Sequence, residues 1–180
     1  RAGDNDLVIA GGFENMSAAP HFAHVRGGIK FGDGRLVDHM QFDGLTCPFE
    51  GWAMGNAADH IARKHDVNRA EQDRFSAQSH QRAAAATEAG HFDAEIVALS
   101  GAQVGNRRNP GPEGGLARDE GIRADSTAEG LAKLRALPGH EFITAGNASQ
   151  ISDGAAAVIV ASEAKASDIG AAPIARIVDY

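Results

Sequence analysis

Two apolar runs of strand length, far apart in the sequence, bracket a mostly polar stretch of more than a hundred residues. The first run, residues 7–10, stops at the pair Gly11 and Gly12, and the second covers residues 155–161. Short continuous apolar runs are typical of strands that are buried on both faces of a sheet. We therefore predict two buried strands of one sheet, a tight turn at the glycine pair, and an α/β core that carries a large inserted subdomain.

The stretch between the two runs shows the periodicity of two helices. Apolar residues at helical spacing predict the first helix over residues 54–64. The second begins after Asn68, which has the spacing of a capping box with Glu71, and it ends before Gly90. A last helix is predicted after Ser162, which is a favourable N-cap residue.

The remaining segments have weaker patterns. We predict strands over residues 94–99 and after Pro173, a loop over residues 101–115, and a short helix over residues 127–137. Residues 17–48 are irregular and rich in glycine and histidine. Long segments without secondary structure are uncommon in compact domains unless they are functional, so this stretch is a candidate functional loop.

Composition excludes several classes of function. The 180 residues suffice for one domain, and the formal charge of −7 argues against binding to nucleic acid, which needs a basic surface. We interpret the adjacent basic pairs, Arg63–Lys64 and Arg107–Arg108, as solvated surface. No apolar run approaches the roughly 20 residues of a membrane span. The single cysteine, Cys47, cannot form an intrachain disulfide, which agrees with a cytoplasmic location.

The two ends of the sequence indicate a piece of a longer protein. The chain begins at Arg1, directly before the first apolar run, and ends at Tyr180 within the pattern of another strand. Natural domains rarely begin and end so close to core strands. We expect an internal fragment that folds poorly by itself, because its sheet lacks neighbouring strands.

Few residues indicate chemistry by pattern alone. Glu14 lies beside the glycine pair, where a lone carboxylate more often binds loop amides than acts in catalysis. Ser149, in a loop of small residues, could donate a hydrogen bond to an amide-bearing ligand such as a pantetheine arm, or satisfy its own turn. The residues alone leave both interpretations open. His60 and His65 are five positions apart and share no helix face, so we predict no metal site.

Taken in order, motifs along essentially the whole chain resemble those of the thiolase family, which comprises acetyl-CoA acetyltransferases and 3-ketoacyl-CoA thiolases. Each motif is weak alone, but their ordered occurrence is specific. The matching positions are 11–17, 36–38, 43–45, Met54, Gly55, Ala58, Asp59, Arg69, Gln72, Asp73, 79–83, 119–123, 133–135 and 144–154.

The resemblance implies a layered α/β core of thiolase type with a large inserted loop domain. It assigns residues 1–16 and 147–170 to the N-terminal domain and residues 17–146 to a loop domain that covers coenzyme A. Residues 171–180 would begin the C-terminal domain. This division agrees with the two bracketing strands inferred from the apolar pattern alone.

The resemblance also implies covalent catalysis, in which a cysteine thiolate takes up the acyl group. A histidine raises the thiolate fraction and a second cysteine moves a proton. The family places the nucleophile upstream of Arg1 and the other two residues beyond Tyr180, so we assign no catalytic residue within the chain. Cys47 lies in neither cysteine motif and is interpreted as an ordinary thiol. No metal and no permanently bound cofactor are implied; coenzyme A and acyl-CoA are substrates.

Family positions that contact coenzyme A or the acyl chain correspond to Leu45, Met54, Arg123, Ala145 and Ser149. Arg123 can pair with a phosphate or lie against the adenine. Its structural alternative is a surface arginine that pairs with Asp119 or Glu120. Leu45 and Met54 can line the tunnel for pantetheine and acyl chain, and their structural alternative is the hydrophobic core.

Three departures disfavour a short-chain family member, whereas the run at residues 79–83 and the missing histidine favour a degradative 3-ketoacyl-CoA thiolase and leave the acyl chain length open. Ala53 stands where a histidine precedes the Met-Gly pair, Gly130 replaces a serine of the coenzyme A site, and residues 137–138 replace an Ala-Phe pair. We expect a role in fatty acid degradation (β-oxidation) and a homo-oligomer, a dimer or tetramer. The alternatives are an inactive scaffold for coenzyme A binding or oligomerisation, and a decarboxylating or lipid-transfer relative, which the match over residues 69–83 disfavours.

Overall fold

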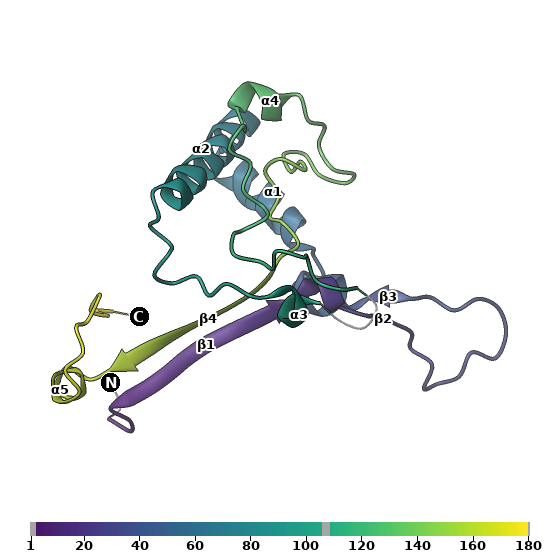
Figure 1. Ribbon diagram of the computed structural model, residues 1–180. Helices are drawn as coiled ribbons and strands as arrows, with labels where there is room; N and C mark the ends of the chain where they lie inside the picture. Colours follow the sequence, from purple (N-terminus) through teal and green to yellow (C-terminus); the bar gives the residue numbers. More distant parts are fainter. Residues whose placement is uncertain (1–2, 106–108, 180) are drawn as a thin grey trace. The chain divides into compact units, whose positions relative to one another are not determined.

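A computed structural model describes residues 3–105 and 109–179 of the chain. The chain divides into two compact units, one formed by the segments up to Met40 and from Ile151 onward, and the other by Gln41–Gln150. The basic pair Arg107–Arg108 lies outside the described residues. In chain order the elements are β1 (Leu7–Asn15), the 3-10 helix η1 (Met16–Ala18), β2 (His21–Phe22), β3 (Val37–Asp38), the π-helix η2 (Met40–Gly44), α1 (Met54–Lys64), α2 (Arg69–Glu88), α3 (Gly101–Val104), α4 (Ala128–Ala132), β4 (Asp153–Ala161) and α5 (Glu163–Asp168) (Figure 1).

The first unit is built on a ribbon of two antiparallel strands, β1 and β4, which run side by side over their whole lengths (Figure 1). The register pairs Leu7 with Ala161 at one end and Asn15 with Asp153 at the other. This direct pairing of two distant segments confirms the prediction that the two apolar runs share one sheet. A second, shorter antiparallel pair joins β2 to β3.

The glycine pair lies inside β1, so the prediction of a tight turn at Gly11 and Gly12 is wrong. Both glycines belong to the ladder, opposite Ala157 and Ala156 respectively. A Cβ atom added to Gly11 would lie 2.6 Å from the carbonyl oxygen of Ala156, whereas one added to Gly12 would meet no atom within 4 Å. Gly11 therefore permits a close approach of the two strands and does not reverse the chain.

Both strands of the ribbon are exposed along their whole lengths, so the prediction of buried strands is wrong for this chain. Phe13, Ile9 and Ile159 are 87%, 76% and 69% exposed. The physical reason is that an apolar run indicates two faces that need cover, and a ribbon of two strands cannot cover either face itself. Each face needs a further layer of structure to become a core.

Polar contacts fix the two ends of the ribbon. The carboxylate of Asp153, at the start of β4, accepts a hydrogen bond from the backbone N–H of Ser17 at 2.9 Å, and Asn15 caps η1. Hydrogen bonds from the N–H and the hydroxyl of Ser17 hold the pKa of Asp153 below its ordinary value. At the other end, Ser162 caps α5 as predicted, by accepting the N–H of Lys165 at 3.1 Å.

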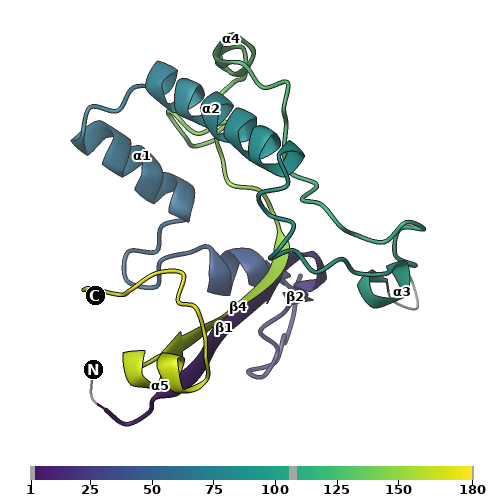
Figure 2. The same ribbon diagram turned by 60° about the vertical axis from the view of Figure 1, so that its left-hand side comes forward.

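In the second unit, α1 and α2 lie where the sequence predicts them. The capping box is complete, because the side chains of Asn68 and Glu71 each accept the backbone N–H of the other at 3.0 Å. Beyond α2, Gly90 has a φ of 71°, and the N–H of His91 returns to the carbonyl of Ala86 at 3.0 Å. The short helix α4 packs against α2 (Figure 2).

Two predicted strands are not found. Residues 94–99 form turns and irregular backbone, and only Leu99 makes an isolated bridge, to Leu116. The segment after Pro173 forms no strand within the described residues, which end at 179. Both segments have the apolar, β-branched composition of strands, but strand formation depends on a pairing partner, which local composition does not provide.

Two other boundaries also differ from the prediction. The helix expected over residues 127–137 is limited to α4, because the chain leaves the helix and Ala136 pairs with Thr144 in a bridge. The loop expected over residues 101–115 contains the short helix α3 in its described part. Within residues 3–105 and 109–179, the helices are all too short or too polar to cross a membrane.

Candidate functional site

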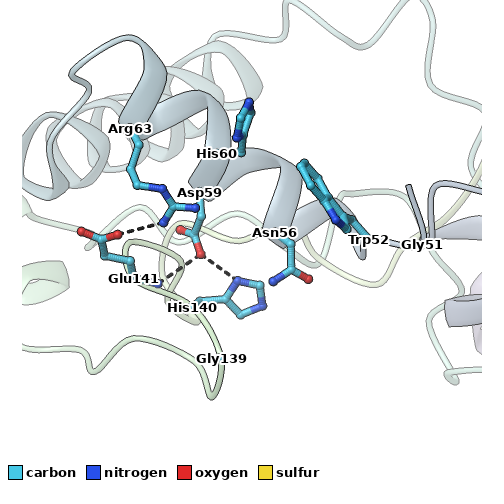
Figure 3. A pocket seen from close by; sticks show the side chains of 9 residues that line it. All are labelled: Gly51, Trp52, Asn56, Asp59, His60, Arg63, Gly139, His140 and Glu141. Carbon is cyan, nitrogen blue, oxygen red and sulfur yellow. Dashed lines mark hydrogen bonds and ion pairs between the residues drawn. The ribbon is translucent and has the colours of Figure 1, made fainter. Parts of the chain in front are cut away.

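A buried carboxylate on α1 anchors a distant turn of the second unit (Figure 3). Asp59 is 3% exposed and accepts the backbone N–H groups of Glu141 at 3.1 Å and Phe142 at 3.0 Å. Its third partner is the Nδ1 atom of His140 at 3.0 Å. Burial raises the pKa of Asp59, but the bonds from Phe142, Glu141 and His140 outweigh burial and hold that pKa below its ordinary value. Asp59 is therefore a charged carboxylate that satisfies the backbone N–H groups of Glu141 and Phe142.

An open groove of about 780 Å³ lies beside this anchor, between α1 and residues 139–141 (Figure 3). The rings of Trp52 and His60, 5.5 Å apart, line it together with Arg63, whose guanidinium pairs with Glu141 at 2.9 Å. The lining residues include no serine, threonine, cysteine or lysine. Two of its carboxylates are already paired, Asp59 with His140 and Glu141 with Arg63. The groove therefore offers a surface for binding.

A second buried carboxylate, Asp73 on α2, is 1% exposed and orients Arg69 one helical turn earlier. The Nε atom of Arg69 donates to both carboxylate oxygens of Asp73, at 2.9 Å and 2.8 Å. The Nη2 atom of the same guanidinium donates to the carbonyls of Leu131 at 2.8 Å and Leu134 at 3.0 Å. The guanidinium thus binds carbonyls at and just beyond the C-terminal end of α4, where a cation complements the helix dipole.

Further along α2, two consecutive side chains hold the segment that precedes α4. The Nδ1 atom of His80 accepts the backbone N–H of Arg123 at 3.2 Å. The side-chain amide of Gln81 donates to the carbonyl of Ser126 at 2.9 Å. Three motif residues on this helix, Arg69, His80 and Gln81, therefore bind backbone groups of residues 123–134.

The loop that follows residue 141 is held by its own hydrogen bonds. Thr144 is fully buried, and its N–H donates to the side chain of Asn147 at 2.7 Å. The amide nitrogen of Asn147 donates to the carbonyl of Phe142 at 3.0 Å. At the end of this loop, the side-chain amide of Gln150 donates to the carbonyl of Gly121 at 2.7 Å. The loop and the segment around residue 121 are therefore joined.

The sequence-predicted contact residues fall into two groups in the second unit. Leu45 and Met54 are neighbours, because the N–H of Met54 donates to the carbonyl of Leu45 at 2.9 Å. Met54 is 62% exposed and Leu45 is half-buried, so Met54 is not a core residue. The second group comprises Arg123, Ala145 and Ser149, all exposed. The bond between Gln150 and Gly121 brings the chain around Ser149 to the chain around Arg123.

Arg123 does not form the ion pair that its structural alternative predicts. Its Nη1 atom donates to the backbone carbonyl of Glu120 at 3.3 Å, and no ion pair joins it to the carboxylates of Asp119 or Glu120. None of the five predicted contact residues lines the groove beside Asp59. Four of the five predicted residues are thus exposed, and Leu45 is half-buried.

Sequence reasoning missed the anchoring carboxylates as functional elements of the scaffold. The available signal is position: Asp59 lies three residues before the buried Ala62, and Asp73 four residues before the buried Ala77. Residues at these spacings share one helix face, and an aspartate on a buried face requires partners. Cys47 is half-buried in a tight turn, where its N–H donates to the carbonyl of Trp52 at 2.8 Å. No group of three or more His, Cys, Asp or Glu side chains suited to a metal ion occurs within residues 3–105 and 109–179.

Curated relatives resemble the chain over nearly all of its length. An acetyl-CoA acetyltransferase of Rhizobium meliloti is 45% identical, with 99% of this chain and 44% of that protein covered. A probable acetyl-CoA acetyltransferase of Mycolicibacterium smegmatis is 48% identical, with 98% and 45% covered. The chain therefore spans about half the length of the curated relatives it matches.

Solved structures show the same fold. Human mitochondrial 3-ketoacyl-CoA thiolase superposes with a TM-score of 0.83 at 36% identity, covering 98% of this chain and 43% of that chain. The same human enzyme in complex with CoA gives a TM-score of 0.79 at 35% identity, covering 93% and 40%. Residues 1–164 match the family model described as "Thiolase, N-terminal domain". The chain thus has a thiolase-like α/β fold and belongs to the thiolase family.

Proposed function

We propose that this chain is part of a thiolase that cleaves 3-ketoacyl-CoA with free coenzyme A, or condenses acetyl-CoA in the reverse direction. The acyl group passes to a cysteine thiolate and then to the acceptor. The nucleophile and the acid–base residues belong to segments of the parent protein outside these residues. Support comes from the family match over residues 1–164 and from the fold shared with a thiolase in complex with CoA.

In this proposal the chain contributes the binding of coenzyme A, which acts as a substrate and not as a bound cofactor. Leu45 and Met54 contact the pantetheine arm and the acyl chain, Arg123 contacts the nucleotide, and Ala145 and Ser149 lie along the arm. The observation that carries this assignment is the hydrogen bond between Gln150 and Gly121, because it joins the two loops that present these polar and small residues. The exposed guanidinium of Arg123 suits a phosphate, with which it can form paired charge-assisted hydrogen bonds.

The same proposal extends to the domain organisation, location and assembly of the parent protein. Residues 17–146 form the inserted loop domain over the coenzyme A, flanked by residues 1–16 and 147–170 of the N-terminal domain and by the start of the C-terminal domain at 171–180. The parent is a cytoplasmic homo-oligomer that acts in fatty acid degradation. The apolar ribbon of β1 and β4, exposed along its length, is consistent with a fragment whose sheet is completed by other parts of the parent.

The test is steady-state thiolysis by the intact parent protein, with acetoacetyl-CoA and a longer 3-ketoacyl-CoA as substrates. Loss of a charge-assisted contact in Arg123→Ala should raise the KM for coenzyme A about tenfold, and loss of a neutral contact in Ser149→Ala about threefold. The kcat should change little, because neither residue contacts the reacting carbon. The control is Arg82→Ala, an exposed arginine on α2.

The outcomes separate the candidate functions. Absence of thiolysis by the intact, folded parent, with retained binding of coenzyme A, would favour the inactive scaffold. Thiolysis with an unchanged KM in both Arg123→Ala and Ser149→Ala would retain the enzyme and reject these contact residues. The ratio of kcat/KM for the two substrates measures the acyl chain preference.

A further inference from the structure

Arg123 is the charged residue among the proposed contacts, and its backbone is held from outside its own segment. The N–H of Arg123 donates to the Nδ1 atom of His80, 43 positions earlier on α2, at 3.2 Å. The next residue on the helix, Gln81, donates to the carbonyl of Ser126 at 2.9 Å. Two consecutive side chains of one helix therefore form hydrogen bonds with both ends of the turn at residues 123–126.

The turn itself is short and has few contacts of its own. The N–H of Ser126 returns to the carbonyl of Arg123 at 3.1 Å, which closes the turn. The guanidinium of Arg123 rests on the carbonyl of Glu120 at 3.3 Å, and the side chain is exposed. The contact from His80 is the one that fixes the peptide plane on the N-terminal side of Arg123, and this plane sets the direction in which the side chain leaves the backbone.

His80 is suited to this task by its place on the helix and by its chemistry. It is half-buried, and α2 around it is a regular helix anchored at its start by the capping box and by the buried Asp73. An acceptor must carry a lone pair, so this hydrogen bond requires the form of the His80 ring in which Nδ1 carries no proton. A rigid helix thus presents an acceptor at a defined point to an otherwise exposed turn.

We propose that His80 is a positioning residue for coenzyme A binding, which aims the guanidinium of Arg123 by holding its backbone N–H. The inference rests on the proposed function, because it takes Arg123 as a contact for the nucleotide. His80 itself does not touch the ligand. A purely structural role in the packing of α2 predicts loss of stability, whereas the positioning role predicts a selective loss of coenzyme A affinity.

The experiment is a double-mutant cycle on the intact parent, with the KM for coenzyme A and kcat measured for each variant. His80→Ala should raise the KM roughly three- to tenfold, as expected for loss of one hydrogen bond, with kcat within about twofold. His80→Asn should restore most of the affinity, because the amide oxygen of asparagine can accept the same N–H. In the Arg123→Ala background, His80→Ala should have no further effect on the KM.

Controls separate positioning from folding. His91→Ala replaces an exposed histidine just beyond α2 and should leave the KM unchanged. His80→Phe keeps a flat ring of similar size without a nitrogen, so the cycle is repeated with it and does not depend on the alanine variant remaining folded. The thermal midpoints of all variants identify any loss of folded protein.

Three outcomes would overturn the inference. An unchanged KM in both His80→Ala and His80→Phe, with Arg123→Ala still weakening coenzyme A binding, rejects His80 and leaves the proposed function intact. Equal effects of the His80 variants with and without Arg123 show that His80 acts by another route. An unchanged KM in Arg123→Ala rejects the proposed contact residue and the positioning role together.

Discussion

The ribbon of β1 and β4 and the unit formed by Gln41–Gln150 hold their chains together in different ways. The ribbon is a regular ladder of backbone pairs with both faces exposed. The second unit consists of helices joined by long loops, and its distant segments are held by side chains that bind backbone groups, chiefly Asp59 and Arg69.

The two regions therefore differ in how their stability is distributed over the residues. A ladder distributes its stability over many similar bonds, so its register depends on close and uniform approach of two backbones. An anchored loop concentrates its stability in a few buried polar groups, each of which leaves unsatisfied partners when it is removed. Substitutions in the two regions should therefore differ in how much stability they remove and in how many residues they affect.

The largest effect is expected at Asp59. Asp59→Ala leaves two backbone N–H groups and the ring of His140 without their acceptor, and should lower the local stability of the second unit by about 3 kcal/mol. Residue-resolved hydrogen exchange of the intact parent measures it, with faster exchange in α1 and residues 139–142. The matched control, Asp125→Ala, changes an exposed aspartate. Equal acceleration in β1 and β4 would remove the proposed distinction between the regions.

A smaller loss of stability is expected when Arg69 is replaced. Arg69→Ala removes the partner of the buried Asp73 and two contacts, to the carbonyls of Leu131 and Leu134, and should lower stability by about 2 kcal/mol. Exchange at the amides of α4 and residues 131–134 reports the loss. Arg69→Lys should recover only part of it, because an ammonium group lacks the planar fork that reaches both sets of acceptors. Full recovery with lysine would show that charge alone suffices.

The ribbon is tested by two neighbouring glycines. Gly11→Ala places a Cβ against the carbonyl of Ala156 and should cost about 1.5 kcal/mol through displacement of the backbone. Gly12→Ala meets open space and should change stability by less than about 1 kcal/mol. The readout is exchange at the amides of β1 and β4. Similar results for both substitutions would mean that the close approach at Gly11 does not limit the register.

The smallest effect is expected from acid. Because the pKa of Asp59 is lowered on folding, its contribution to stability is complete above the ordinary value of 3.8 and is lost as pH falls through the folded pKa. Asp59→Asn should flatten this pH dependence in the second unit only. The ribbon should keep its own acid response through Asp153, whose pKa is also lowered. Hydrogen exchange or circular dichroism over pH 2 to 5 makes the comparison, and an unchanged acid profile of the second unit would contradict it.

Sequence predicted the elements that depend on local signals. The bounds of α1 follow from spacing, and the start of α2 follows from Asn68 and Glu71, which interact within one helical turn. Elements that depend on distant partners were predicted less well. Residues 94–99 and the segment after Pro173 have strand composition without a strand partner, and Gly11 matched a turn because its true neighbour, Ala156, is far away in the chain.

The candidate site was likewise predicted only in part from the sequence. Motif order identified the family, and with it the residues proposed to bind coenzyme A. The supports of those residues were not visible, because the bonds from Asp59 to residues 141 and 142 and from His80 to Arg123 link positions more than forty apart. Only the placement of an aspartate on a buried helix face gave a usable signal.

The register of the ribbon also has a consequence for biosynthesis. Asn15 pairs with Asp153, so the ribosome adds about 140 residues between them, which takes roughly 7 to 30 s at ordinary rates of translation. During that interval the backbone edge of β1 that later pairs with β4 is unpaired, and an unpaired strand edge can associate with other chains. The order of the two strands in the gene thus sets how long this edge of β1 stays without its native partner.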